Sequence, residues 1–99
     1  MRKIEWLQPS LADLQGIFDY IAQDNLDRAY SFVREIETEV QKLSEFPMLG
    51  VEIKTDSKGD VRALHYKEYT ATYRIHDTYI AVLEVCHQSK HKRRITLVK

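Results

Sequence analysis

The run of residues 61–87 constrains the fold of this chain more than any other part of its sequence. Within it, two segments of alternating character, 66–75 and 78–86, flank the dipeptide His76-Asp77. So short a connection between two such segments predicts a β-hairpin. The second segment is apolar on both faces, which favours a central strand. We therefore expect a small sheet built around this hairpin, with residues 61–64 as a further strand.

The first strand of this predicted hairpin indicates which face of the sheet is buried. Its apolar side chains occupy every second position, at Tyr69, Ala71, Tyr73 and Ile75. Alternation of this kind is expected when one face of an antiparallel sheet packs on helices and the other meets solvent or a partner. Helices are therefore expected on the face that carries these four residues.

An amphipathic helix is predicted near the start of the chain and is expected to run to about Ala22. Ser10, with Asp13 three residues later, matches a capping box, in which the serine oxygen accepts a backbone N–H and the carboxylate reaches back to the cap. The helix is therefore expected to open at Ser10. Its apolar residues recur at three- and four-residue spacing, at Leu11, Leu14, Ile17, Phe18 and Ile21.

A second and longer helix is predicted to follow, with the same apolar rhythm over residues 29–43. Either Asp24 or Asn25 can cap its start. The helix is expected to end near Phe46, because Pro47 disfavours helical geometry in the residue before it. Two helices joined by a few residues form a hairpin, and its shared apolar side must be covered by the sheet.

The remaining segments complete an α+β arrangement. Residues 4–7 have short β character, 51–55 indicate a strand or part of a loop, 57–60 have the composition of a turn, and 95–98 predict a last strand or a tail that orders on a partner. The expected fold is an N-terminal strand and a two-helix antiparallel hairpin packed on one face of a small, mainly antiparallel β-sheet. A chain of 99 residues is expected to form one domain over residues 1–99.

Charge is divided unevenly between the two halves of the chain, although the whole chain has a net charge of zero. Residues 1–60 hold seven Lys and Arg against twelve Asp and Glu, a net charge of −5, and residues 61–99 hold eight against three, a net charge of +5. This asymmetry suggests a face for a polyanion or an acidic partner, and the other interpretation is a solvated basic C-terminus without a partner.

Composition excludes several classes of protein. The single cysteine, Cys86, cannot form an intrachain disulfide, and its apolar strand favours a packed thiol. No stretch has the length of a membrane span or the character of a signal peptide, so we expect a cytoplasmic protein. The histidines lack the spacing of a metal site, and no glycine-rich phosphate loop is present, so we predict no metal and no cofactor.

Many short features occur in an order that is typical of one family: Asp13 and Leu14, Ile17, Tyr20 and Ile21, Ala29, Phe32, Ile36, residues 43–50, residues 62–64, Tyr69, Tyr73 and Arg74, Ile80, Val82 and Leu83, and Val85, Cys86 and His87 before basic residues. With its amino-terminal strand, the chain resembles the toxins of bacterial toxin–antitoxin modules of the RelE/ParE type over nearly its whole length. The resemblance implies a small intracellular toxin, neutralised by a cognate antitoxin in a hetero-oligomer. It also implies one of two mechanisms.

In the first mechanism, RelE-like members enter the ribosome and cleave messenger RNA. Such cleavage needs a proton acceptor, a proton donor and fixed positive charge at the phosphate. The candidate catalytic residues are His87, Tyr69, Arg62 and Arg74, with His91, Arg93 and Arg94 as further candidates. RelE-like enzymes carry an arginine directly after the tyrosine, where this chain has Thr70, and they are strongly basic, whereas this chain is neutral. The purely structural alternative is that Tyr69 is a core residue and that Arg62 and Arg74 form surface ion pairs.

In the second mechanism, ParE-like members bind DNA gyrase and trap it on broken DNA. The exit of the second helix over residues 46–50 and the long helical hairpin resemble this branch more closely, so we favour it. The expected partner-binding residues are then Lys90, His91, Lys92, Arg93 and Arg94. A third hypothesis is an inactive homologue. In either active case we expect an apolar groove along the helical hairpin or the sheet edge, which an antitoxin helix or strand fills.

Overall fold

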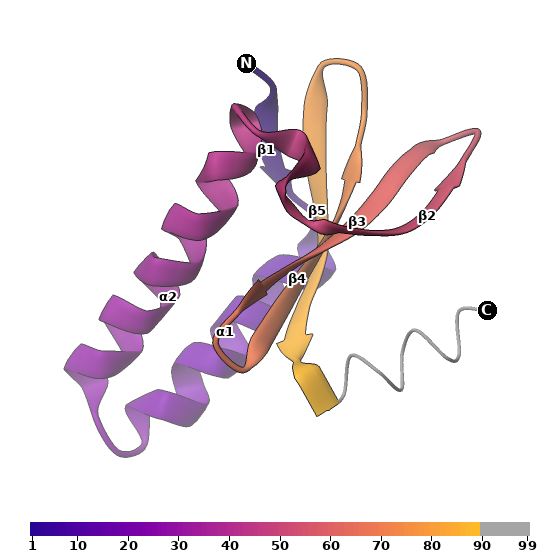
Figure 1. Ribbon diagram of the computed structural model, residues 1–99. Coiled ribbons are helices and arrows are strands. Elements are labelled where there is room, and N and C mark those ends of the chain that lie inside the picture. The colour runs from indigo at the N-terminus through magenta and orange to yellow at the C-terminus, as the bar shows by residue number, and fades with distance from the viewer. Residues whose placement is uncertain (90–99) are drawn as a thin grey trace.

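The computed structural model of the chain describes residues 1–89, which form two α-helices and one five-stranded sheet (Figure 1). Two short 3₁₀ turns, η1 and η2, join the second helix to the second strand. The elements in chain order are β1 (Lys3–Trp6), α1 (Gln8–Ala22), α2 (Leu26–Gln41), η1 (Lys42–Ser44), η2 (Pro47–Leu49), β2 (Val51–Asp56), β3 (Gly59–Tyr66), β4 (Tyr69–Ile75) and β5 (Tyr79–His87).

The strand order in the sheet is β1-β5-β4-β3-β2. β1 runs parallel to β5, and the other three pairs are antiparallel. The predicted α+β arrangement with a mainly antiparallel sheet is therefore confirmed, as is the central position of the second hairpin strand, β5. Residues 51–55, for which the sequence left a strand and a loop open, form most of the edge strand β2.

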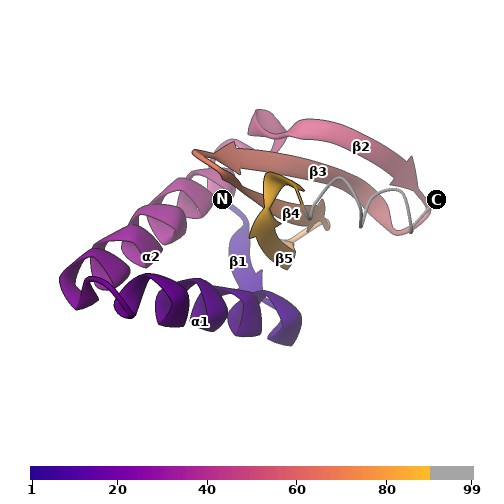
Figure 2. The ribbon, with the colours of Figure 1, turned by 90° about the horizontal axis from the view of Figure 1, so that it is seen from below.

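Both helices lie on the same side of the sheet, as Figure 2 shows from below. The core forms between them and consists of Leu14, Ile17, Phe32, Ile36, Val40, Leu43, Leu64, Ala71, Tyr73, Ile80, Val82 and Val85. Tyr73 and Ala71 are buried, and Tyr69 and Ile75 pack against this core. The predicted helix-facing side of β4 is therefore confirmed.

The capping box predicted at Ser10 is wrong. Helix α1 begins earlier, at Gln8, because Pro9 suits the first turn of a helix, where its missing N–H is not needed. Leu7 is the capping residue and provides no side-chain hydrogen bond. The Ser10 hydroxyl donates back to the Leu7 carbonyl oxygen at 2.6 Å, and Asp13 has a different partner, described below.

Helix α2 is capped by Asn25, one of the two predicted residues, whose side chain accepts the Arg28 backbone N–H at 3.0 Å. The helix ends at Gln41, before the predicted end near Phe46, and the chain continues in the tighter turns η1 and η2. The prediction placed the end too late because the apolar spacing continues through Leu43, which is fully buried from the 3₁₀ turn.

The predicted hairpin strand over residues 66–75 begins too early. Tyr66 ends β3 and pairs with Tyr69, so the turn between β3 and β4 is Lys67 and Glu68. The strand predicted over residues 61–64 is correspondingly longer, from Gly59 to Tyr66. The strand predicted over residues 95–98 lies outside the described residues. No helix within residues 1–89 is long and apolar enough to cross a membrane.

Candidate functional site

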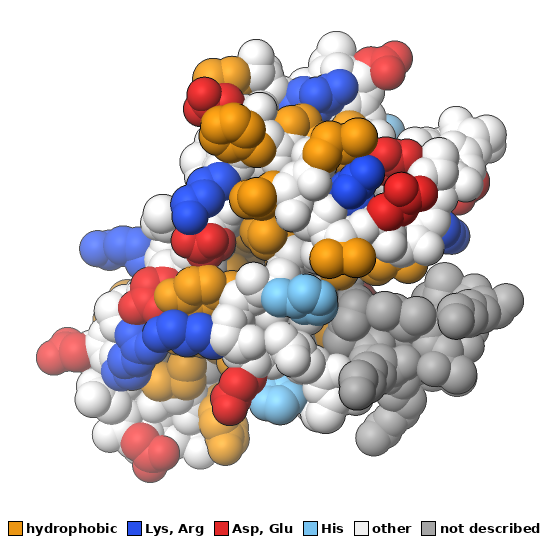
Figure 3. Space-filling model, in the orientation of Figure 1, with side chains coloured by type: hydrophobic (Ala, Val, Ile, Leu, Met, Phe, Trp, Pro, Cys, Tyr) orange, Lys and Arg blue, Asp and Glu red, His pale blue; other side chains and the backbone are white. Residues whose placement is uncertain are grey.

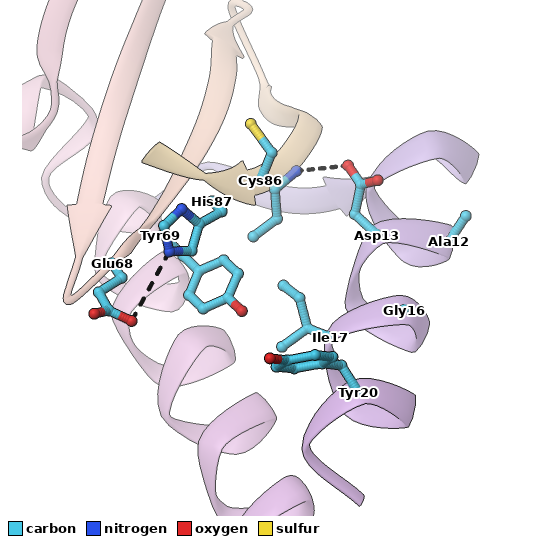
Figure 4. Close-up of a pocket in the computed structure, with 10 residues that line it drawn as sticks. Ala12, Asp13, Gly16, Ile17, Tyr20, Glu68, Tyr69, Cys86 and His87 are labelled. Atoms are coloured by element: carbon cyan, nitrogen blue, oxygen red, sulfur yellow. Dashed lines mark hydrogen bonds and ion pairs between the residues drawn. The ribbon is translucent and has the colours of Figure 1, made fainter. Parts of the chain in front are cut away.

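A groove separates helix α1 from the last part of β5. Strand β1 pairs with β5 only as far as Val82, so residues 83–87 have no neighbouring strand on that side within the described chain. The groove beside this free edge has a volume of about 550 Å³. Its lining residues are Ala12, Asp13, Gly16, Ile17, Tyr20, Glu68, Tyr69, Val85, Cys86 and His87 (Figure 4).

The Asp13 carboxylate joins α1 to the free edge of β5. Its Oδ2 accepts the backbone N–H of Val85 at 2.8 Å (Figure 4). A carboxylate that accepts a backbone N–H forms a charge-assisted hydrogen bond, which is stronger than a neutral one. Asp13 thus satisfies a strand donor that no β-strand reaches, and it sets the spacing between the helix and the strand at one end of the groove.

Gly16 leaves the helical side of the groove open. A Cβ atom added at this position would meet no atom within 4 Å. The glycine lies in the middle of α1, where it destabilises a helix relative to alanine by roughly 0.5–1 kcal/mol. The next turn of the helix presents Tyr20, which is 71% exposed and faces the groove (Figure 4).

Tyr69 and His87 meet on the strand side of the groove. They are directly paired between β4 and β5, and their rings contact edge to face with centroids 5.4 Å apart. Glu68 Oε1 lies 3.9 Å from His87 Nε2, and Ser89 Oγ lies 3.1 Å from His87 Nδ1. Burial raises the pKa of Tyr69 above its usual value.

The turn that precedes Tyr69 is held in a strained conformation. Lys67 has a φ of +53°, in the left-handed region that is unfavourable for a side chain. The Gln88 side chain donates to the Lys67 carbonyl oxygen at 2.9 Å, and the Gln88 backbone N–H donates to the Glu68 carbonyl oxygen at 2.8 Å. The end of β5 therefore fixes the turn from which Tyr69 continues.

Glu35 fixes the same turn from helix α2. Its carboxylate accepts hydrogen bonds from the Tyr66 hydroxyl at 2.5 Å and from Arg28 at 2.7 Å, and Lys67 Nζ lies 3.6 Å away. These contacts, with that from Tyr66 the largest, lower the pKa of Glu35 to about 2. The same hydrogen bond raises the pKa of Tyr66. The network ties α2 to the β3–β4 turn.

Arg62 and Arg74, predicted with Tyr69 and His87 as catalytic candidates, lie elsewhere. Arg62 is directly paired with Tyr73, four positions further along β4 from Tyr69, or roughly 14 Å of strand. Its Nη1 donates to the Gly50 carbonyl oxygen at 2.8 Å. Arg74 forms an ion pair of 2.8 Å with Asp56. The structure therefore brings Tyr69 and His87 together and places both arginines beside the β2–β3 hairpin.

Both arginines have partners that support the β2–β3 hairpin. Arg74 also donates to the Gly59 carbonyl oxygen at 3.1 Å, and Arg62 lies 3.7 Å from the carboxylates of Glu52 and Asp60. Both arginines thus form ion pairs with nearby carboxylates, as the structural alternative for them expects. The predicted partner-binding residues, Lys90, His91, Lys92, Arg93 and Arg94, all lie outside the described residues.

A second groove follows the outer side of the helical hairpin. It has a volume of about 590 Å³ and is lined by Leu11, Leu14, Gln15, Phe18, Tyr30, Val33, Arg34 and Glu37. Leu11 and Tyr30 are 46% and 57% exposed, and the Tyr30 ring packs edge to face on Phe18. The described residues thus present two grooves beside α1, and no cluster of three or more His, Cys, Asp or Glu in this part of the chain could hold a metal ion.

The model of the family described as "ParE toxin of type II toxin-antitoxin system, parDE" matches residues 4–91. The chain belongs to the ParE toxin family. Two solved structures have the same fold. One is that of the chromosomal ParDE toxin–antitoxin system from P. aeruginosa, with a TM-score of 0.72, 24% identity, and coverage of 88% of this chain and 96% of the other. The other is the RelBE2 toxin–antitoxin complex of Mycobacterium tuberculosis, with a TM-score of 0.57, 21% identity, and coverage of 87% and 96%.

A search among curated proteins found no significant match. The family match confirms the resemblance to RelE/ParE toxins and the preference for the ParE branch. This ParE-family chain is therefore the toxin component of a type II toxin–antitoxin system.

Of the residues that line the groove of this ParE-family toxin, only Tyr69 and His87 were predicted as site residues from the sequence. Asp13 was assigned to a helix cap, and Gly16 and Tyr20 received no role. One signal was present for Tyr20, since it is an aromatic residue outside the apolar stripe of its helix. The hydrogen bond of Asp13 depends on a tertiary contact with β5, which local sequence spacing does not encode.

Proposed function

We propose that this toxin inhibits growth by binding DNA gyrase and holding it on broken DNA, rather than by cleaving RNA. The observation that carries this proposal is the match to the ParE toxin family over residues 4–91. A second observation supports it, the composition of the groove beside Tyr69 and His87. No Lys or Arg lines it within the described residues, and Arg62 and Arg74 are bound at the β2–β3 hairpin. Cleavage of an RNA phosphate needs fixed positive charge beside the acid and the base. A binding mechanism has no such requirement.

The proposed partners are gyrase and a cognate antitoxin, in the cytoplasm. The two grooves beside α1 have linings of apolar and polar side chains, and we propose that they take a helix or an extended segment of an antitoxin. The basic residues Lys90, His91, Lys92, Arg93 and Arg94 are proposed to contact the antitoxin or gyrase. The toxin and antitoxin then form a hetero-oligomer.

A ribosome-dependent mRNA endonuclease is the second candidate. The contact between Tyr69 and His87 in an open groove favours it, because a histidine beside a tyrosine can move protons during RNA cleavage. An inactive homologue that remains bound to its antitoxin is the third candidate.

Two purified assays separate the first two candidates. Gyrase and supercoiled DNA are incubated with the toxin, and cleaved DNA is measured. In parallel, messenger RNA on stalled ribosomes is incubated with the same toxin and its length is followed. We expect gyrase-dependent DNA cleavage and intact messenger RNA. Shortened messenger RNA with no DNA cleavage would refute the gyrase proposal.

Expression in bacteria tests the third candidate. We expect the toxin to stop growth when expressed alone, and the product of the neighbouring open reading frame to restore growth when co-expressed. Normal growth in the presence of folded toxin would eliminate both active mechanisms and leave the inactive homologue.

A further inference from the structure

The segment between α2 and β2, together with the first residue of β2, exposes four large apolar side chains. Phe46, Met48, Leu49 and Val51 are 58%, 63%, 51% and 63% exposed. We call residues 46–51 the apolar turn. Figure 3 shows apolar side chains gathered where this segment crosses the front of the molecule. None of the four lines either groove described above. They form a separate apolar surface, of the kind that marks protein contacts.

The backbone of the apolar turn is nevertheless held firmly from inside the protein. The Tyr73 hydroxyl donates to the Pro47 carbonyl oxygen at 2.6 Å and accepts the Gly50 N–H at 2.9 Å. Arg62 donates to the Gly50 carbonyl oxygen at 2.8 Å. Tyr73 is fully buried, and the Arg62 side chain is 12% exposed. Two largely buried polar side chains therefore hold the turn in one conformation.

Gly50 shows how closely the turn is packed against its support. A Cβ atom at this position would lie 2.7 Å from the Tyr73 hydroxyl and 2.8 Å from the Ala63 carbonyl oxygen. The glycine backbone is therefore in direct contact with β3 and β4, while the side chains on both sides of it point outward. The exposed apolar side chains of this rigid turn add little buried surface to the core. The fixed backbone does lower the entropic cost of binding a partner.

The charges beside the apolar turn limit the kind of partner. Glu45 and Glu52 flank it and are both exposed. Glu45 forms no ion pair within the described residues. The ion pair between Glu52 and Arg62 is long, at 3.7 Å. A second copy of this chain, bound through the same surface, would bring these like charges together, which is unfavourable. A partner with Lys or Arg beside an apolar pocket is complementary.

We propose that the apolar turn is the surface by which this toxin docks onto its protein target, and that the target offers an apolar pocket bordered by basic side chains. The turn presents side chains and not a groove, so it needs a concave, folded partner. The grooves beside α1 are concave and instead require a segment that inserts into them, so we assign them to the antitoxin. This inference rests on the proposed function, in which the toxin acts by binding a protein.

A double variant, Met48→Asp with Leu49→Asp, tests the inference. Both side chains are more than half exposed, so the folded state should change little, which circular dichroism and thermal unfolding will check. We expect growth inhibition and gyrase-dependent DNA cleavage to need about 10-fold more toxin or to be lost, as for the removal of a central binding residue. Affinity for the antitoxin, measured by calorimetry, should change less than about 2-fold.

Two further variants complete the experiment, the first as a control and the second as a test of the charge beside the apolar turn. Leu26→Asp, which adds a charge at an exposed apolar residue outside both grooves and outside the apolar turn, should leave growth inhibition unchanged. Glu45→Lys should weaken target binding by several-fold and leave the fold unchanged, because it reverses one charge beside the apolar turn. If the double variant unfolds, the single variant Met48→Gln replaces it, since it removes the apolar contact without adding charge.

The outcomes separate the inference from the proposed function. A wild-type toxin that neither stops growth nor acts on gyrase would refute the proposed function and this inference with it. A toxic wild type with an equally toxic double variant would refute the inference alone. A double variant that loses both antitoxin binding and toxicity would also refute the inference, because the apolar turn would then belong to the antitoxin-binding surface.

Discussion

Lys67 is the one non-glycine residue with a positive φ among residues 1–89. A side chain in this conformation costs about 1–2 kcal/mol, which glycine avoids. We predict that Lys67→Gly raises the free energy of unfolding by about 0.5–1 kcal/mol, because glycine also adds entropy to the unfolded chain. Its ion pair with Glu35 is exposed and contributes little. Urea unfolding at neutral pH measures the change.

Glu68 is the matched control for this prediction, because it is the other residue of the same turn and its φ is not positive. Glu68→Gly should lower the free energy of unfolding. Equal effects of the two substitutions would show that the strain at Lys67 contributes nothing to stability.

Glu35 makes the stability of the toxin depend on pH. Its pKa is about 2 in the folded chain, against 4.5 for an ordinary glutamate, because of Tyr66 and Arg28. A carboxylate whose pKa is lowered on folding stabilises the protein above its unfolded pKa and loses this effect as the pH falls through the folded pKa. We predict that the stability difference between wild type and Glu35→Gln shrinks as the pH falls from about 5 to 2. Unfolding curves at a series of pH values check this.

Tyr66→Phe tests the cause of the lowered pKa. Without the hydroxyl donor, the pKa of Glu35 should rise toward its ordinary value, which NMR titration of the carboxyl group measures. Tyr30→Phe is the control, since Tyr30 packs on Phe18 and is not among the groups that shift Glu35. An unchanged Glu35 pKa in Tyr66→Phe would contradict the assignment.

At the scale of elements, one side chain links helix α1 to the free part of β5. We predict that Asp13→Ala lowers the free energy of unfolding by about 1–3 kcal/mol, because it leaves the Val85 N–H without its acceptor. Amide hydrogen exchange at Val85 should also become faster. Asp19→Ala is the control, because Asp19 lies on the same helix and accepts only an exposed hydrogen bond from Gln15. Equal free energies of unfolding for the two variants would show that the hydrogen bond between Asp13 and Val85 does not stabilise the fold.

The support of the apolar turn gives a second prediction at this scale. Tyr73→Phe removes both hydrogen bonds of the hydroxyl and leaves the Gly50 N–H buried without a partner, so we expect a loss of about 1–3 kcal/mol in unfolding free energy. Tyr69→Phe is the control, since no hydrogen bond of the Tyr69 hydroxyl occurs within the described residues. Thermal unfolding of both variants, compared with wild type, provides the measurement.

The elements were largely predictable from the sequence, and their ends were less so. Apolar spacing predicted both helices, and alternation predicted the β4 face and the central β5, because these patterns arise from burial on one side. The end of α2 at Gln41 was missed because Leu43 continues the apolar spacing from a 3₁₀ turn. The start of β4 was missed because Tyr66 and Tyr69 both fit an alternating strand, although a two-residue turn separates them.

At the scale of the whole molecule, the candidate site was predicted only in part. The sequence predicted the hairpin of β4 and β5, but its two-residue turn would pair Tyr69 with Glu84. The observed pairing of Tyr69 with His87 depends on a longer connection, in which Ile75 pairs with Ile80, and on an irregularity between Thr72 and Tyr73. The separate location of Arg62 and Arg74 depends on β2 and its carboxylates, whose position at the far edge of the sheet no local pattern encodes. The groove between α1 and β5 depends on where β1 stops along β5, which is likewise set by packing.

Binding of an antitoxin should stabilise the whole toxin. A partner that binds only the folded state at 100 times its dissociation constant adds about 2.7 kcal/mol. For a chain of about 100 residues this raises the thermal midpoint by roughly 10–20 °C. We predict a rise that increases with antitoxin concentration, measured by calorimetry of the complex. A midpoint that does not change with concentration would contradict binding to the folded toxin.

The parallel pairing of β1 with β5 also determines when a new toxin molecule can be completed. The first strand of the chain joins the sheet through the last described strand, so it must wait for nearly the whole chain to be synthesised. Helix α1 waits as well, because Asp13 bonds to the same strand. Each toxin molecule therefore completes its fold only after β5 has been synthesised. Any partner already present in the cell has this interval in which to meet the toxin before it can act.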